Sequence, residues 1–263
     1  MSAGPAMRWD PDQYLRFSDE RTRPFFDLLA RVAAHDPHRV VDLGCGPGHL
    51  TARLADRWPN AVVEGIDSSP EMIERARASS AAPRVSYTLG DLRDWQPSSP
   101  VDVLVSSATL QWVPHHLDLL PRWVGHLQRG GWLAIQVPGN FDSPAHRTLF
   151  ELAKEEPWAS HCVVPVTQRP SAPGPDVYLD VLAEAGCDVD AWETTYLHVL
   201  DGDDAVFWWM KGTGARPVLA ALPDEIRPAF EAAYMERLRE AYPRRAYGTV
   251  LPYRRVFAVA QRR

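Results

Sequence analysis

The chain has few cysteines, no long apolar segment and almost no lysine. Its three cysteines, Cys45, Cys162 and Cys187, are scattered, which indicates neither a disulfide framework nor a metal site. No run of about 18 apolar residues is present, and the first residues, MSAGPAMR, lack the apolar region of a signal peptide. We therefore expect a soluble protein of the reducing cytoplasm that does not contact a membrane.

Positive charge comes almost entirely from arginine, since lysine occurs only at Lys154 and Lys211 among 28 basic residues. The formal net charge of -6 disfavours a nucleic-acid-binding surface. Arginine presents a planar fork of donors that can hold a carboxylate bidentately. A length of 263 residues with 45% hydrophobic residues suits one large domain or one domain with an inserted lobe. No coiled-coil heptad is present, and we expect a monomer.

The most informative stretch is residues 39–50, RVVDLGCGPGHL. A short apolar run is followed by Gly44, Gly46 and Gly48, and then by an amphipathic segment. This order predicts a buried parallel strand, a glycine loop and the start of a helix, the corner where open α/β sheets bind ligands. His49 stands where the NAD fingerprint requires glycine, and no lysine follows the loop as in a phosphate-binding P-loop.

Strands alternate with helices after this loop. The further strands that we predict in the first half cover residues 61–66, 84–89, 101–106 and 132–137. Helices are expected between them, with a turn at 128–131, and two helical segments at 9–17 and 20–34 precede the first strand. Such alternation is typical of a doubly wound, mostly parallel sheet in an α/β protein.

The second half is less regular. We predict helices at 143–155 and 176–185, a proline-rich surface loop at 165–175, and strands at 189–200 and 255–260. The excursion between these two strands includes a long helical run at 224–241. A hairpin needs only a few residues, so an insertion of this size is expected to cover an active site, the alternative being a peripheral helical decoration.

We accordingly expect three parts. These are an N-terminal helical cap at 1–34, a core made of 35–200 and 254–263, and a helical lid at 201–253.

An acidic residue ends the second predicted strand. Asp67 follows the glycine loop at the spacing of about 20 residues that suits a ribose-binding carboxylate. Its simpler alternative role is a helix N-cap. Met72, in the first turn of the next helix, can pack on an adenine ring, and ordinary core packing is an equal alternative.

Blocks along nearly the whole chain resemble the trans-aconitate 2-methyltransferases, a family of class I S-adenosylmethionine (SAM)-dependent methyltransferases. The blocks are YLRFSDERTRP, VVDLGCGPG, GIDSSPEMI, LRDWQP, SSATLQWVP, EAGCDVDAWETTYLHVL and TGARPVL. The resemblance implies a Rossmann-like sheet of seven strands with a helical lid inserted before the last strand. It also implies SAM as methyl donor, S-adenosyl-L-homocysteine as product, and monomethyl ester formation on a carboxylate of trans-aconitate, a small tricarboxylate.

The resemblance places the cofactor at the glycine loop and at the ends of the following strands. The cofactor-binding residues that it implies are Asp42, Gly44, Cys45, Gly46, Gly48, Asp67, Ser68, Met72, Asp91, Leu92, Ser107 and Ala108. Asp42 can meet the ammonium group of the methionine part. A polar side chain near Gly90 can reach the adenine amino group.

A tricarboxylate needs cations and hydrogen-bond donors, some of which hold two carboxylates while the third reacts. The substrate-binding residues that we expect are Tyr14, Arg21, Gln111, Trp112, Tyr196, His198, Arg216, Arg254 and Arg255. Most single arginines could equally lie on the surface, and His198 could face solvent. Carboxylates ionise near pKa 4, so no catalytic side chain is expected, and rate enhancement should come from proximity and orientation.

Other functions stay open at this point. The chain could methylate another small carboxylic acid or the malonyl group of a carrier protein, although its acidic net charge offers no obvious basic face for a carrier. It could bind SAM without catalysis. A nicotinamide-dependent oxidoreductase is disfavoured by His49.

Overall fold

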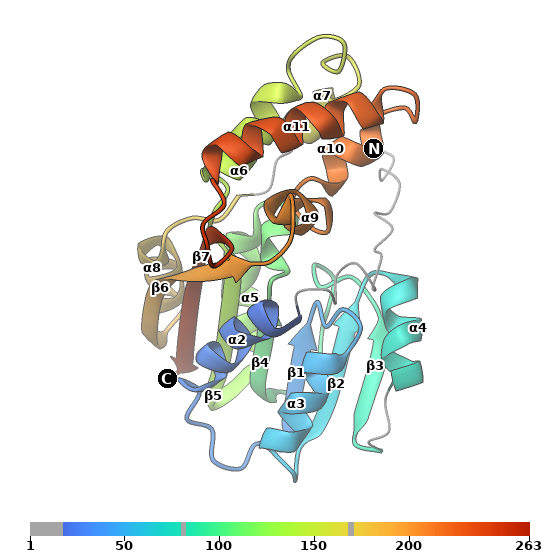
Figure 1. The fold of residues 1–263 in the computed structure, drawn as a ribbon. Helices are drawn as coiled ribbons and strands as arrows, with labels where there is room; N and C mark the ends of the chain where they lie inside the picture. The colour runs from blue at the N-terminus through green and yellow to red at the C-terminus, as the bar shows by residue number, and fades with distance from the viewer. Residues whose placement is uncertain (1–17, 80–82, 168–170) are drawn as a thin grey trace.

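The structure is a computed structural model that describes residues 18–79, 83–167 and 171–263, so the predicted helical segment at 9–17 lies outside it. Seven strands form one sheet in the order β3-β2-β1-β4-β5-β7-β6 (Figure 1). They are β1 (Arg39–Leu43), β2 (Val62–Asp67), β3 (Val85–Leu89), β4 (Val101–Ser107), β5 (Leu127–Pro138), β6 (Cys187–Leu200) and β7 (Thr249–Arg262). β7 is the one strand of this sheet that runs opposite to the other six, so the predicted mostly parallel sheet is confirmed.

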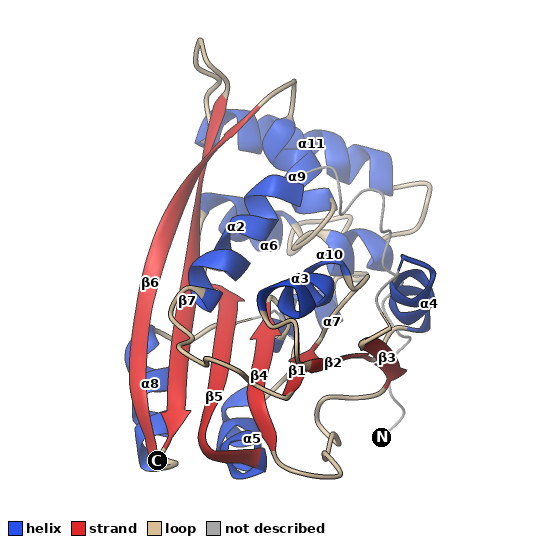
Figure 2. Cartoon of the chain, turned by 90° about the horizontal axis from the view of Figure 1, so that it is seen from below, coloured by secondary structure: helices blue, strands red, loops and turns tan. Residues whose placement is uncertain are grey.

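Helices cover both faces of the sheet (Figure 2). One face packs on α2 (Ser18–Leu29) and α3 (His49–Arg57), and the other on α5 (Leu120–His126) and α8 (Pro175–Glu184). Val40 belongs to the first cluster and Val41 to the second, because successive strand residues point to opposite faces. The apolar runs of the sequence are thus buried on both sides, as expected of a doubly wound sheet.

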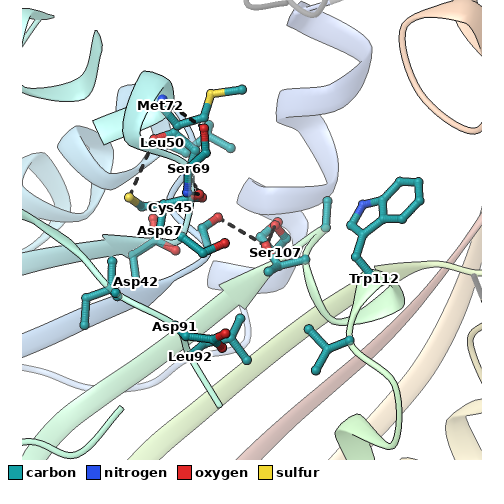
Figure 3. A pocket seen from close by; sticks show the side chains of 18 of the residues that line it. Asp42, Cys45, Leu50, Asp67, Ser69, Met72, Asp91, Leu92, Ser107 and Trp112 are labelled. Carbon is teal, nitrogen blue, oxygen red and sulfur yellow. Dashed lines mark hydrogen bonds between the residues drawn. The ribbon is translucent and has the colours of Figure 1, made fainter. Parts of the chain in front are cut away.

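The N-terminal helix α2 lies on the sheet itself. Phe25, Leu28 and Leu29 are buried together with residues of β5 and β7. The helix ends at Leu29, before the predicted end at residue 34. At the edge where the parallel strands end, a cavity opens beside α4 (Pro70–Ser79), as Figure 3 shows.

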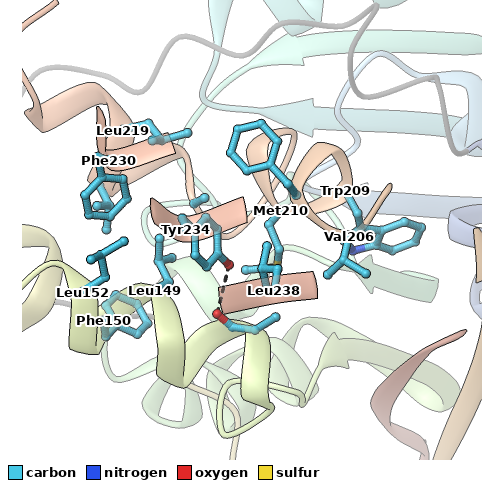
Figure 4. Close-up of a cluster of buried hydrophobic side chains, with 14 of the residues drawn as sticks. Leu149, Phe150, Leu152, Val206, Trp209, Met210, Leu219, Phe230, Tyr234 and Leu238 are labelled. Atoms are coloured by element: carbon cyan, nitrogen blue, oxygen red, sulfur yellow. Dashed lines mark hydrogen bonds between the residues drawn. The ribbon is translucent and has the colours of Figure 1, made fainter. Parts of the chain in front are cut away.

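A second layer of helices lies above the carboxyl ends of the parallel strands (Figure 1). It consists of α6 (Pro144–Leu152), α7 (Val163–Thr167), α9 (Ala205–Lys211), α10 (Arg216–Ala221) and α11 (Arg227–Ala241). These helices share one buried cluster that includes Leu149, Trp209 and Phe230 (Figure 4). The hydroxyl of Tyr234 donates to the Ala145 carbonyl oxygen at 2.9 Å and joins α11 to α6. The helices of residues 201–253, the predicted lid, therefore pack against α6, which ends at Leu152 and lies outside the predicted bounds.

Further boundaries differ from the sequence-based predictions. β7 begins at Thr249 instead of residue 255, because it pairs with β6 along the whole length of both strands. β5 begins at Leu127, and the bend predicted at 128–131 occurs within the strand, where Gly130 has a φ of 76°. The helix α7 enters the predicted proline-rich loop. None of the described helices is long and apolar enough to cross a membrane.

We predict that Phe230→Ala lowers the free energy of unfolding by about 3–5 kcal/mol, because the ring is fully buried in the helical layer and its removal leaves a cavity. Urea denaturation followed by circular dichroism would measure the change. Phe26→Ala is the control, since Phe26 is 47% exposed and its loss should change the free energy by about 0.5 kcal/mol or less. Equal losses in both variants would contradict burial as the cause.

Candidate functional site

The glycine loop between β1 and α3 forms the floor of a cavity of about 370 Å³. Gly44, Gly46 and Gly48 have φ values of 83°, 54° and 81°. A Cβ atom would lie 2.1 Å from the Thr109 hydroxyl oxygen at Gly44, and 2.6 Å from the Tyr87 hydroxyl oxygen at Gly48. Left-handed backbone and close neighbours together require glycine at these two positions. The backbone of the loop can therefore approach a ligand closely.

Two carboxyl groups face this cavity, the buried Asp42 and the partly buried Asp67 (Figure 3). Asp42 accepts a hydrogen bond of 2.6 Å from the Thr51 hydroxyl. Burial raises the pKa of Asp42 to about 7, and the nearby Asp67 carboxylate contributes to the rise. Asp67 accepts bonds of 2.9 Å from the backbone N–H groups of Gly46 and Ser69, which oppose the upward shift of its own pKa by burial. The cavity thus suits a ligand that carries positive charge and hydrogen-bond donors.

Most of the predicted cofactor-binding residues line the same cavity. They are Asp42, Gly44, Cys45, Gly46, Asp67, Ser68, Met72, Asp91, Leu92, Ser107 and Ala108. Gly48 is not among the lining residues and is instead the N-cap residue before α3. Arg93 donates from Nε to both carboxylate oxygens of Asp91 at 3.0 Å, and this bonding holds the pKa of Asp91 below its usual range.

A second, smaller cavity adjoins the first and lies between the edge of the sheet and the helical layer. The two cavities share the residues Leu50, Ser107, Ala108 and Trp112. Trp112 lies in the short 3-10 helix η1 (Leu110–Trp112), which follows β4. In Figure 3 its indole stands across the cavity from Met72 and Asp67. The wall between the cavities is therefore built mainly from the end of β4 and the residues that follow it.

Arg255 supplies positive charge to the second cavity. Its side chain is buried, with 3% exposure, and its Nη1 donates to Gln136 Oε1 at 2.8 Å. The guanidinium carbon lies 4.7 Å from the centre of the Tyr253 ring. Among the described residues, none accepts a hydrogen bond from Arg255 Nε. A buried guanidinium with an unused N–H group at a cavity can bind an anion.

The histidine side chain of the second cavity, His146, is neutral near pH 7. Burial lowers the pKa of His146 to about 4, although the backbone near Asn140 opposes the shift. His146 Nδ1 lies 3.2 Å from the Ser143 hydroxyl oxygen, and its ring meets Phe141 edge to face. His146 therefore contributes shape and hydrogen bonding to the cavity, and Arg255 contributes the charge.

Gln111 lies at the same cavity in a fixed orientation. Its Nε2 donates to the Ala108 carbonyl oxygen at 2.6 Å, and Ala108 itself has a φ of 55°. Because a carbonyl oxygen only accepts hydrogen bonds, the amide nitrogen must face it. Gln111 Oε1 is then a buried acceptor that no described residue contacts with a donor.

Four predicted substrate-binding residues do not line either cavity. Tyr196 donates from its hydroxyl to Asp27 Oδ2 at 2.7 Å, beneath α2. The ring of His198 stacks 5.0 Å from Trp209, so it lies behind a lining residue. Arg254 donates from Nε to Glu193 Oε2 at 2.8 Å on the opposite face of β7 from Arg255. The fourth, Arg216, begins α10.

Two predicted residues cannot be placed. Tyr14 lies outside the described residues, as does the side chain of Arg21.

The sequence-based prediction missed several lining or supporting residues, namely Gln136, His146, Trp209, Thr213 and Gly214. Gln136 could have been noticed as the one polar residue inside the apolar strand WLAIQV. Thr213 and Gly214 are the first two residues of the block TGARPVL. No sequence signal pointed to His146, because α6 reaches the cavity only through its packing with the later helices.

Comparisons with known proteins agree with this geometry. A family model described as a methyltransferase domain matches residues 40–131. A trans-aconitate 2-methyltransferase of Streptomyces avermitilis is 51% identical over 260 residues, covering 97% of each chain. The trans-aconitate 2-methyltransferase of Mycobacterium tuberculosis is 49% identical over 255 residues, covering 96% of each chain.

Solved structures share the fold at low sequence identity. The YcgJ protein of Bacillus subtilis superposes with a TM-score of 0.61 at 12% identity, over 92% of this chain and 98% of that one. A phosphoethanolamine N-methyltransferase of Haemonchus contortus, solved with S-adenosylhomocysteine, gives a TM-score of 0.55 at 15% identity, over 92% of this chain and 53% of that one.

We predict that the free energy of unfolding of Asp42→Asn, minus that of wild type, increases as pH rises from about 4 to about 7. The folded-state pKa of Asp42 is raised to about 7 from its ordinary value of 3.8, so the folded state binds this proton more tightly than the unfolded chain. The contribution of Asp42 to the free energy of unfolding of wild type is full below about pH 4. It is lost as pH rises toward about 7, by up to about 1.4 kcal/mol per pH unit. Asparagine does not titrate and can still accept the Thr51 hydrogen bond.

Urea denaturation at several pH values would test this prediction by the difference in free energy of unfolding between variant and wild type. Asp56→Asn is the control, since its side chain is 67% exposed on the same helix as Thr51. A flat difference for Asp42→Asn across this range would contradict the raised pKa.

Proposed function

The chain belongs to the trans-aconitate 2-methyltransferase family of class I methyltransferases, and on that premise we propose that it methylates a carboxylate of trans-aconitate with SAM as donor. The products are a monomethyl ester and S-adenosyl-L-homocysteine. One observation carries the proposal: two adjoining cavities have opposite charge, acidic at Asp42 and Asp67 and basic at Arg255. Such a pair suits a cationic donor and an anionic acceptor that meet at a shared wall.

The residues present fit SAM. Asp42 and Asp67 are acceptors, which match an ammonium group and ribose hydroxyls, and a Cβ atom built at Gly46 would have no neighbour within 4 Å. Met72 and Leu92 are buried apolar side chains that line the cavity and can contact the adenine ring. When bound, SAM supplies a methyl group on a sulfonium that can be displaced by a nucleophile.

The chain's own residues need not remove a proton in this reaction. A carboxylate is ionised at neutral pH, so it attacks without a general base. Arg255 would hold one carboxylate of the acid through its unused Nε–H group, and Thr213 and Gln111 would border the rest. Fixing the acid beside Ser107 and Ala108 makes the attack effectively unimolecular, which can lower a barrier by about 7–11 kcal/mol in favourable cases.

The helical layer would serve as the lid. It supplies His146, Trp209, Thr213 and Gly214 to the wall of the acid cavity, so it excludes water from the attacking carboxylate. Tyr14 and Arg21 remain predicted contributors to acid binding. We further propose a cytoplasmic monomer, in keeping with three free cysteines and the absence of a heptad pattern.

Incubation of the purified protein with SAM and a panel of acids would test the function. We expect S-adenosyl-L-homocysteine release to be fastest with trans-aconitate, because its spread of carboxylates lets one bind Arg255 while another reacts. The panel includes cis-aconitate, citrate, isocitrate, malonate and a malonyl carrier protein, and mass spectrometry identifies the ester. Faster turnover of the carrier protein or of another acid would replace trans-aconitate as substrate, and binding of SAM without turnover would leave a binding protein.

We predict that Arg255→Gln weakens the apparent affinity for the acid by about 30-fold or more, since loss of a buried charge partner costs about 2 kcal/mol or more. SAM affinity, measured by calorimetry, should stay within a factor of about two. Arg254→Gln is the matched control, because it removes the same group one position earlier on the face that pairs with Glu193. Equal effects of the two substitutions would rule out Arg255 as the specific anion partner.

A further inference from the structure

Gln136 connects the two cavities through groups at both ends of the residue. It lies on β5, between Ser107 of β4 and Phe257 of β7, and its side chain is buried with 1% exposure. Its backbone carbonyl oxygen accepts the N–H of Ala108 at 2.8 Å. Its side-chain Oε1 accepts from Arg255 Nη1 at 2.8 Å. The residue therefore touches the shared wall on one side and the buried cation on the other.

The chemistry of the partners fixes the orientation of this amide. A guanidinium has only donors, so the oxygen of Gln136 must face Arg255. The amide nitrogen then faces Ser107, whose hydroxyl oxygen lies 3.4 Å away. With Nη1 held on this side, the unused Nε–H of Arg255 is left for a ligand.

We infer that Gln136 is a positioning residue for acid binding: its neutral amide orients the Arg255 guanidinium against the wall where methyl transfer occurs, without neutralising its charge. This inference rests on the proposed function, because it assigns Arg255 to the acid. A carboxylate at position 136 would hold the guanidinium equally well. It would also satisfy the charge of Arg255 and repel an incoming carboxylate, so the structure needs an uncharged acceptor here.

The test compares Gln136→Glu with Gln136→Leu. If Gln136 only stabilised the fold, glutamate, which keeps the acceptor and pairs the buried cation, would be the milder substitution. The positioning role requires the reverse order for acid binding. We expect KM and calorimetric Kd for trans-aconitate to rise about 30-fold or more in Gln136→Glu and about 5-fold in Gln136→Leu. The Kd for SAM should remain within a factor of about two in both.

Gln261→Glu is the matched control. Gln261 is an amide on β7 that donates to the Gly130 carbonyl oxygen, at the opposite end of the sheet from the cavities, and its change should leave acid affinity unaltered. Thermal unfolding of each variant checks that it folds. Should Gln136→Glu not fold, Gln136→Asn takes its place, because an amide one methylene shorter cannot hold the guanidinium and should also lose acid affinity about 5-fold.

The outcomes separate this inference from the proposed function. Acid affinity in Gln136→Glu equal to that of wild type, or a larger loss in Gln136→Leu, would overturn the positioning role alone. Turnover of no acid by wild type would overturn the proposed function, while calorimetric binding of the acid to the S-adenosylhomocysteine complex would still report on Gln136. Failure of wild type to bind any acid would overturn both.

Discussion

The direction of β7 is the constraint on which the site depends. The parallel strands all bring their carboxyl ends to one edge of the sheet, where β4 ends at Ser107. An antiparallel strand instead brings its early residues to that edge. In the register of the sheet, Arg255 stands opposite Pro138 of β5 on one side and Thr194 of β6 on the other. The pairing of β7 with its neighbours thus places the buried Arg255 at the edge of the sheet where the parallel strands end in polar residues.

The same pair of strands carries the helical layer. β6 and β7 are paired along their whole length: Cys187 stands opposite Arg262 at one end, and Leu200 stands opposite Thr249 at the other. The chain therefore leaves the sheet and returns to it at neighbouring points. The intervening helices are consequently held above the site by a long ladder, and α6 packs against them through the shared apolar cluster. This arrangement lets residues of the insertion line a cavity whose other walls belong to the sheet.

Opposite charges are kept apart by small groups in this protein. Asp42 and Asp67 lie on one side of the wall formed by Ser107 and Ala108, and Arg255 lies on the other. A direct ion pair between them would satisfy both charges and leave neither for a ligand. Ala108, with its left-handed φ of 55°, turns the chain directly after β4, where the two cavities adjoin. Under the proposed function, the cationic donor and the anionic acid would meet beside these residues.

The sequence was sufficient for the parts of the fold that depend on local pattern. The run RVVDLGCGPG specifies strand, glycine loop and helix start through apolar residues and glycines that are neighbours in the chain. Asp67 could likewise be placed, because the end of a parallel strand fixes where its side chain lies. These features need little knowledge of distant contacts, and the structure has them where the sequence predicts them.

The residues of the second cavity, which we propose binds the acid, could not be identified from the sequence in the same way. Arg254 and Arg255 are equivalent by sequence, and only the register of β7 decides which one faces the cavity, since a shift of one residue reverses the faces. Tyr196 and His198 share a face of β6, as the alternation indicates, but that face is covered by Asp27 of α2 and Trp209 of α9. The partners of these side chains come from segments far apart in the chain, and no local pattern encodes them.

The burial of Arg255 itself is an argument that the site is built for an anion. Removing an ion from water costs several kcal/mol, and buried guanidinium groups are normally paired with carboxylates. Here the described neighbours offer one neutral amide oxygen and the face of Tyr253, which offset only part of that loss. If the side chain at position 255 served only the stability of the fold, an apolar side chain there would stabilise it more than a guanidinium without a carboxylate partner. Under the proposed function, a carboxylate of the acid would recover part of the remaining desolvation on binding to Arg255.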